Sequence, residues 1–230
     1  MKNLFLAAIC FGLMAPMASA QSNCSKYYPM EEGVSMTYTS FNRKGKEDST
    51  VEYKVIDVQE SSSETKATLS MELKAKKGGV FTSNYDLTCR GDKVIIDFET
   101  LMNQQMMGQF GGTEVDITGH DIELPNNLSV GQELADAYVN VSGSLGGAFN
   151  VDMKVEQVNR KVEKKENVTT PAGSFDCYVV YSDTKTKMMV GTQTFSSRMW
   201  LAEDVGIVKQ ESYNQNGKLM GSMQLTSLSR

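Results

Sequence analysis

Residues 67–75 read ATLSMELKA, and this stretch decides the fold class because apolar and polar residues alternate along it. The apolar row consists of Ala67, Leu69, Met71, Leu73 and Ala75. A period of two places one row of side chains against a core and the other row in water, as in a half-buried β-strand. Similar runs occur at 34–42, 50–58, 80–89, 93–98, 136–143, 148–165, 174–188, 192–202, 205–214 and 218–228.

Short turn sequences separate most of these runs, for example 77–79, 90–92 and 216–217, which read KGG, RGD and NG. Turns of this length join antiparallel neighbours, because parallel strands need long crossovers. A sheet of many strands has to curl or close to limit its exposed edges. The sequence therefore predicts an all-β, mainly antiparallel fold: a strongly curved meander or open half-barrel of about ten strands with one short helix.

The helix is predicted for residues 100–112, TLMNQQMMGQFGG, a charge-free run rich in methionine. A threonine suits its start and a pair of glycines suits its end. Met102 and Met106 then share one face at i and i+4, and Phe110 follows one turn later. This face is expected to point inward over an opening of the β-structure.

Two interpretations of the predicted helix stay open. It is either a plug whose methionines fill irregular space, or a movable lid over an apolar cavity. Copper(I) capture by thioethers is a third idea, disfavoured because Met-x-Met spacing is missing. For Trp200, packing within a hairpin is the alternative to a ligand contact. The candidate ligand-binding residues are Leu101, Met102, Met106, Met107, Phe110 and Trp200.

The N-terminus has the features of a secretory signal peptide: Lys2, an apolar run at 4–13, and the small residues Ala18-Ser19-Ala20. The predicted signal peptide is 1–20, with cleavage near Ala20/Gln21 and export to the periplasm. Residues 21–230 then form a single β domain. The alternative is two halves joined near 119–135, suggested by a shared S-[FY]-N-x-x-G-K pattern at 40–46 and 212–218; hairpin chemistry also explains that pattern.

Three cysteines follow the predicted cleavage site, and an exported chain can oxidise a pair of them. Cys24 precedes the first strand, and Cys89 ends a strand. We predict a Cys24–Cys89 disulfide, which would tie down the N-terminal segment. Cys177 lies within a strand and is expected to be a buried free thiol.

Catalytic and metal-binding constellations are not expected. His120 is the sole histidine, and its acidic neighbours Asp116, Asp121 and Glu123 lack metal-ligand spacing. No phosphate-binding glycine motif is present. The formal net charge is −5, and the basic runs at 43–46 and 74–77 are short, so no footprint for nucleic acid or anionic lipid is expected. The sequence thus predicts no enzyme activity, cofactor or metal.

Residues 170–177, TPAGSFDC, and 199–209, MWLAEDVGIVK, resemble the TapB-like family of exported bacterial proteins of unknown function. Residues 28–33 and 124–132 resemble the opening and middle linker of that family. The strand-turn-strand around Trp200 is also similar to periplasmic lipoprotein carriers and lipoproteins with an open half-barrel. The resemblance implies an envelope protein and supplies no catalytic residue.

The leading functional hypothesis is a non-enzymatic periplasmic binding or carrier protein for a lipophilic molecule or envelope component. The alternative is a structural or assembly factor of the cell envelope that acts through protein–protein contacts. A carrier should have a continuous apolar cavity beneath Met102 and Met106. An interaction module should have a filled interior and an exposed apolar patch.

Overall fold

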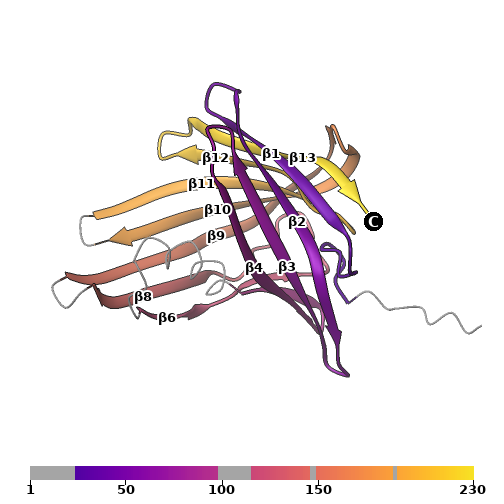
Figure 1. Ribbon diagram of the computed structural model, residues 1–230, viewed down its shortest axis with the longest axis horizontal. Helices are drawn as coiled ribbons and strands as arrows, with labels where there is room; N and C mark the ends of the chain where they lie inside the picture. Colours follow the sequence, from indigo (N-terminus) through magenta and orange to yellow (C-terminus); the bar gives the residue numbers. More distant parts are fainter. Residues whose placement is uncertain (1–23, 98–114, 146–148, 189–190) are drawn as a thin grey trace, which may run out of the picture.

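The structure is a computed structural model, and it describes residues 24–97, 115–145, 149–188 and 191–230 (Figure 1). These residues form one sheet of thirteen β-strands, and no helix occurs among them. The strands are β1 Ser35–Asn42, β2 Glu47–Glu60, β3 Glu64–Ala75, β4 Val80–Arg90, β5 Lys93–Ile96, β6 Val115–His120, β7 Ile122–Pro125, β8 Ala137–Leu145, β9 Phe149–Thr170, β10 Gly173–Met188, β11 Gly191–Ala202, β12 Gly206–Asn214 and β13 Leu219–Ser229. The helix predicted for 100–112 lies outside the described residues.

The strand order is β6-β8-β9-β10-β11-β12-β13-β1-β2-β3-β4-β5-β7, and every neighbouring pair is antiparallel. The all-β, antiparallel and strongly curved architecture is therefore confirmed. The predicted strand number was too low, because β6 and β7, of six and four residues, were not among the predicted runs.

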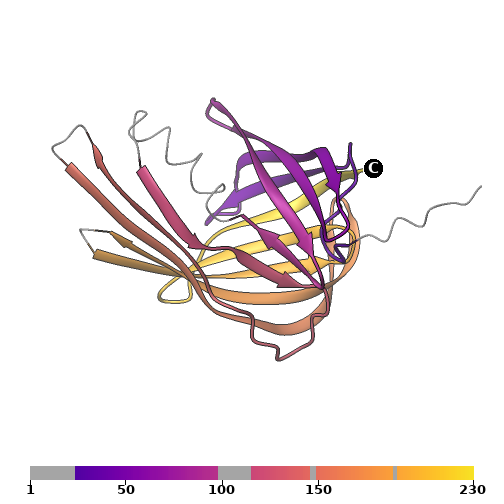
Figure 2. The same cartoon turned by 90° about the horizontal axis from the view of Figure 1, so that it is seen from below.

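The two ends of the strand order meet through the chain itself. β6 and β7 are the two edge strands, yet only Asp121 separates them in sequence. The nearly buried Arg160 of β9 also bridges this seam: its guanidinium donates hydrogen bonds to the carbonyl of Ala135 at 2.6 Å and to that of Glu123 in β7 at 3.0 Å. The sheet is therefore nearly closed, with β1–β4 facing β9–β11 across the interior (Figure 2).

The N-terminal segment fills one end of this interior. Tyr27, Met30 and Val34 are buried in the main core. A Cys24–Cys89 disulfide fixes the segment to the end of β4, as predicted, and Cys177 is a buried free cysteine, also as predicted. Burial raises the pKa of the Cys177 thiol to about 11, which keeps it protonated and unreactive. We call this end of the molecule the disulfide end.

Burial declines along the strands toward the opposite end, which we call the rim end. On β3, Ala67 and Leu69 are fully buried, whereas Met71 and Leu73 of the same inward row are only partly buried. On β4, Leu87 is buried, but Phe81 near the rim end is 37% exposed. The predicted apolar row is thus a continuous inner surface, of which only the half near the disulfide end is filled.

The two copies of the S-[FY]-N-x-x-G-K pattern form equivalent hairpin turns at the rim end. The side-chain oxygens of Asn42 and Asn214 each accept two backbone N–H groups of the turn. Gly45 and Gly217 have φ angles of 70° and 72°, which favour glycine. Local turn chemistry therefore accounts for the shared residues, and the resemblance needs no duplicated half.

Candidate ligand-binding site

A cavity of about 180 Å³ lies on the inner face, between the filled disulfide end and the rim end. Its walls come from the N-terminal segment and from β1, β2, β3, β4, β5, β12 and β13, so segments distant in sequence build it. Its lining side chains are almost all apolar or aromatic, namely Tyr28, Met36, Tyr38, Tyr53, Leu69, Tyr85, Leu87, Ile96, Ile207, Gln210 and Met223. For comparison, an engineered apolar cavity of about 150 Å³ binds benzene. This space can hold a ring-sized or short acyl group.

Three of the tyrosines form a chain of edge-to-face contacts across the wall of β1–β4. The ring centroids of Tyr38 and Tyr53 are 5.7 Å apart at an interplanar angle of 78°. Those of Tyr53 and Tyr85 are 5.8 Å apart at 88°. Such geometry aligns ring edges with ring faces and holds the side chains in place. The chain therefore provides a preformed aromatic wall for the cavity.

The tyrosine hydroxyls give this wall a neutral polar character. Desolvation by burial raises the pKa of Tyr28, Tyr38, Tyr53 and Tyr85. All four therefore stay uncharged over the usual pH range and can donate or accept a hydrogen bond. None of their hydroxyls bonds to another described residue. A hydroxyl that faces the cavity can donate a hydrogen bond to a polar atom of a ligand or water, or accept one from it.

A second cavity of about 260 Å³ shares Gln210 and Met223 with the first and reaches the rim end. Its other lining residues are Ser40, Phe41, Ser212, Gly221 and Ser222. The two cavities share Gln210 and Met223 as lining residues. No charged side chain lines either of them in the part of the chain that the structure describes.

Trp200 is on the opposite face of the sheet. It pairs with Lys209, whereas Met199 pairs with the cavity-lining Gln210, and neighbouring residues of a strand point to opposite faces. Its indole is 5% exposed, lies 4.6 Å beneath the ammonium of Lys209 and donates to Glu166 at 2.7 Å. The structure therefore places Trp200 in a packed outer position and does not bring it to the cavity.

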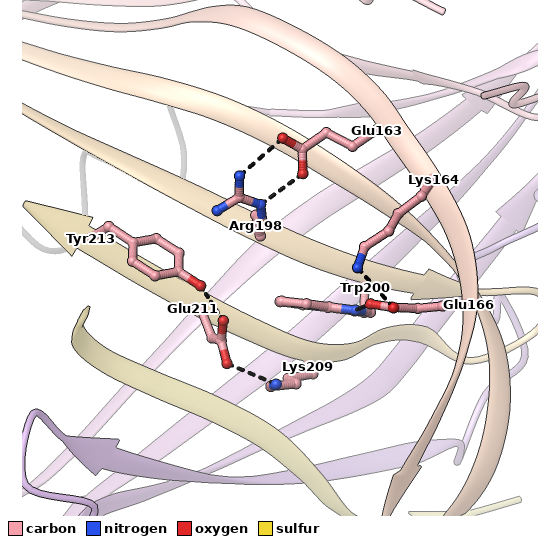
Figure 3. A network of polar contacts seen from close by, with 8 residues as sticks. All are labelled: Glu163, Lys164, Glu166, Arg198, Trp200, Lys209, Glu211 and Tyr213. Carbon is pink, nitrogen blue, oxygen red and sulfur yellow. Dashed lines mark hydrogen bonds and ion pairs between the residues drawn. The ribbon is translucent and has the colours of Figure 1, made fainter. Parts of the chain in front are cut away.

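The outer face around Trp200 carries a network of polar contacts (Figure 3). Arg198 donates two hydrogen bonds to Glu163, at 2.7 and 3.0 Å, and this pairing raises the pKa of Arg198. Tyr213 donates to Glu211, which also pairs with Lys209. These groups hydrogen-bond and ion-pair with one another across β9, β11 and β12, so the network joins the three strands.

Five of the six candidate ligand-binding residues lie outside the described residues, namely Leu101, Met102, Met106, Met107 and Phe110. The interpretations of their segment as a lid or as a plug therefore stay predictions. His120 ends β6 and contacts the ring of Tyr138, with centroids 5.2 Å apart. No group of three or more potential metal ligands occurs in the described ranges. Within those ranges no helix is long and apolar enough to cross a membrane.

A third cavity, of about 370 Å³, lies beside Arg160 at the seam. Its lining includes Glu133, Asp136 and Lys161, so charges of both signs face it. Arg160 is held by backbone carbonyls, and burial lowers its pKa. The lining of this cavity is mainly polar and charged, in contrast to that of the tyrosine-lined cavity.

Sequence reasoning missed the tyrosine wall. A signal was present, because Val51, Tyr53 and Val55 alternate in β2, and Tyr85 precedes Leu87 by two positions in β4. Inward-facing tyrosines among aliphatic residues mark a surface that is apolar with a polar edge. That they meet across four strands depends on strand register, which the sequence does not reveal.

A curved, nearly closed antiparallel sheet with a tyrosine-lined cavity on its inner face defines the class of protein. Within that class, the chain belongs to the DUF3108-like family, whose family model matches residues 31–225. The narrower TapB-like resemblance receives no separate support from this match. A search of curated proteins gave no match.

Two solved structures share the fold. One is a Bacteroides fragilis protein described as exported and as having a YmcC-like fold, with a TM-score of 0.71, 18% identity, and coverage of 90% of this chain and 100% of that one. The other is a Parabacteroides distasonis protein described as a lipoprotein, with a TM-score of 0.72, 22% identity and the same coverage. At these identities the likeness concerns the fold alone.

Proposed function

We propose that this protein is a non-enzymatic, exported binding or carrier protein that holds a lipophilic molecule on the inner face of its curved sheet. The observation that carries the proposal is the tyrosine-lined cavity on the inner face of the described strands. A filled interior would instead favour an interaction module. Export to the periplasm rests on the predicted signal peptide and on relatives described as exported or as lipoproteins. The TapB-like resemblance belongs to the same proposal.

The ligand group that enters the cavity is expected to be uncharged. Burying an ionised group without a partner is strongly unfavourable, and the described residues of the two cavities offer only hydroxyls, one side-chain amide and apolar surface. A neutral ring or acyl group with a hydroxyl or carbonyl matches this lining. The tyrosine hydroxyls would bond to its polar atom while the rings cover its apolar part.

A matched pair of fluorescent probes tests the proposal. N-phenyl-1-naphthylamine is neutral, and 8-anilino-1-naphthalenesulfonate has the same aromatic skeleton with an added sulfonate. We expect saturable binding of the neutral probe and at least tenfold weaker binding of the anion, measured at 0.5 M salt to screen the net charge of the chain. Equal binding of the two probes would contradict the preference for neutral ligands but not the carrier function. Binding of neither probe would contradict the carrier function itself.

Variants locate the site. Tyr53→Phe and Tyr85→Phe remove hydroxyls from the cavity wall with little loss of volume, and Tyr138→Phe on β8 is the control. With an uncharged naphthyl ketone as probe, each wall variant should weaken binding about three- to tenfold, the contribution of one hydrogen bond. Binding that changes equally in the Tyr138 variant would place the probe elsewhere. Native mass spectrometry of protein taken from its own envelope would then identify the natural ligand.

The second candidate, a structural or assembly factor of the envelope, is favoured by one observation. Most of the large apolar side chains that are exposed among the described residues lie near the rim end: Val80, Phe81, Met188, Phe195, Leu219 and Met220. Exposed apolar side chains gathered in one region commonly mark a contact surface. Stable co-purification of one envelope protein with an empty cavity would favour this candidate over the carrier.

A further inference from the structure

Folding assembles a basic surface that the sequence alone does not display. The β1–β2 and β3–β4 turns are adjacent because β2 pairs with β3, and the β12–β13 turn lies beside the β1–β2 turn because β13 pairs with β1. The ends of β10 and β11 follow next, since β11 pairs with β12. We call this row of hairpin ends the rim. In Figure 1 the labelled hairpins of β1–β2 and β12–β13 extend toward the same side.

Basic residues dominate the rim although the whole chain is acidic. The basic residues of the rim are Arg43, Lys44, Lys46, Lys74, Lys76, Lys77, Lys185, Lys187 and Lys218, and the acidic ones are Glu47, Asp48, Glu52, Glu72 and, opposite Lys185, Glu156 of β9. Within the described residues, Lys74 pairs with Glu72 and Lys76 pairs with Glu47. The other basic side chains form no ion pair with a described residue, so a net positive charge remains. The short basic runs at 43–46 and 74–77, interpreted from sequence as isolated solvated turns, thus belong to one surface.

The exposed apolar side chains lie in the same region as these charges. Val80 and Phe81 follow the β3–β4 turn, Met188 ends β10, and Leu219 and Met220 follow the β12–β13 turn. A surface that combines lysines with exposed apolar side chains suits the interface of a membrane with anionic lipids, where the charges meet headgroups and the apolar groups enter below them. A protein partner would need an acidic surface of matching shape, whereas a lipid surface adapts to the row of hairpin ends.

We propose that the rim docks on a membrane surface that contains anionic phospholipids. The inference goes beyond lipophile binding and does not depend on it. Where both hold, docking brings the second cavity, beside Ser40 and Ser222, toward the lipid surface. The acidic remainder of the protein then faces away from the membrane, which orients the molecule as it approaches.

Vesicle sedimentation of the full exported chain tests the proposal. Vesicles of phosphatidylcholine with about one third phosphatidylglycerol should bind the protein, and vesicles of phosphatidylcholine alone should bind it at least tenfold more weakly. Each basic residue near an anionic surface strengthens binding about fivefold. Binding should therefore fall steeply between 0.05 and about 0.5 M salt, as screening increases.

Two double variants with the same change in net charge distinguish an effect of the rim from an effect of the net charge of the protein. Lys44→Glu with Lys77→Glu alters the rim and should weaken binding to anionic vesicles at least tenfold. Lys54→Glu with Lys161→Glu alters exposed lysines elsewhere on the sheet and should change it less than twofold. Equal losses in the two variants would overturn the proposal, as would equal binding to both kinds of vesicle or binding to neither. Thermal unfolding of both variants verifies that each is folded. Capture of an envelope protein that requires Lys44 and Lys77, without vesicle binding, would assign the rim to a protein partner and likewise overturn the proposal.

Discussion

The disulfide end and the rim end differ in how deeply their side chains are buried, although the same strands run through both. At the disulfide end, the N-terminal segment and the disulfide fill the interior, and side chains such as Tyr27 and Leu225 are fully buried. Toward the rim end, the same inward rows continue over a hollow surface and finish in exposed apolar and basic hairpins. Because buried side chains contribute most to stability, we expect the stability of the sheet to be concentrated at the disulfide end.

Removal of the Cys24–Cys89 disulfide should lower the free energy of unfolding more than any other change considered. Replacing Cys24 and Cys89 with serine removes a link that closes a loop with a sequence separation of 65. The chain-entropy relation predicts a loss of about 4 kcal/mol in the free energy of unfolding. Urea unfolding measures the loss, and peptide mapping under non-reducing conditions verifies the pairing. Cys177→Ala is the control and should cost much less, because it removes one small thiol. A loss below about 1 kcal/mol in the double variant would show that the N-terminal segment holds without the link.

Packing also differs between the two ends within a single strand, β13. Leu225 and Leu219 both lie in β13, but Leu225 is fully buried whereas Leu219 is 37% exposed near the rim. Leu225→Ala leaves a cavity in the core and should cost about 3 kcal/mol. Leu219→Ala should cost less than about 1 kcal/mol, because its side chain is already in contact with water. Equal losses in chemical denaturation would contradict the gradient in packing between the two ends.

The sequence predicted the parts of this fold that depend on local pattern. Period-two runs predicted β3 and most other strands. The disulfide was predicted from the position of Cys24 before the first strand and of Cys89 at the end of a strand. β6 and β7 were not predicted. The seam held by Arg160 could not be predicted, because its acceptors are backbone carbonyls that no sequence pattern marks.

The candidate site was less predictable for a related reason. A cavity depends on strand register and curvature, which the sequence does not reveal. The sequence instead favoured the methionines and Trp200, which stand out in composition. Tyr53 and Tyr85 looked like ordinary strand residues until pairing brought them together. The basic rim has the same origin, since the runs at 43–46 and 74–77 become neighbours only when β2 pairs with β3.

The smallest expected effect concerns the outer face, where Glu166 joins β9 to β11. A hydrogen bond from Lys164 and another from Trp200 lower the pKa of Glu166 below its ordinary value of 4.5. Because the folded state favours the charged form, the stabilisation is fully present above pH 4.5 and is lost as the pH falls through the lowered pKa. The side chain of Glu166 is 35% exposed, so solvent screening limits the effect to less than about 1 kcal/mol.

Glu166→Gln keeps an oxygen that can accept the Trp200 N–H but removes the charge that the pH dependence requires. The variant should therefore be slightly less stable than the parent at pH 7, and the difference should vanish as the pH approaches about 3. Urea unfolding at a series of pH values measures this, with Glu60→Gln, at an exposed carboxylate near the β2–β3 turn, as the control for net charge. A difference that stays constant with pH would mean that the outer network stabilises the sheet through packing of Trp200 and not through the ionised carboxylate.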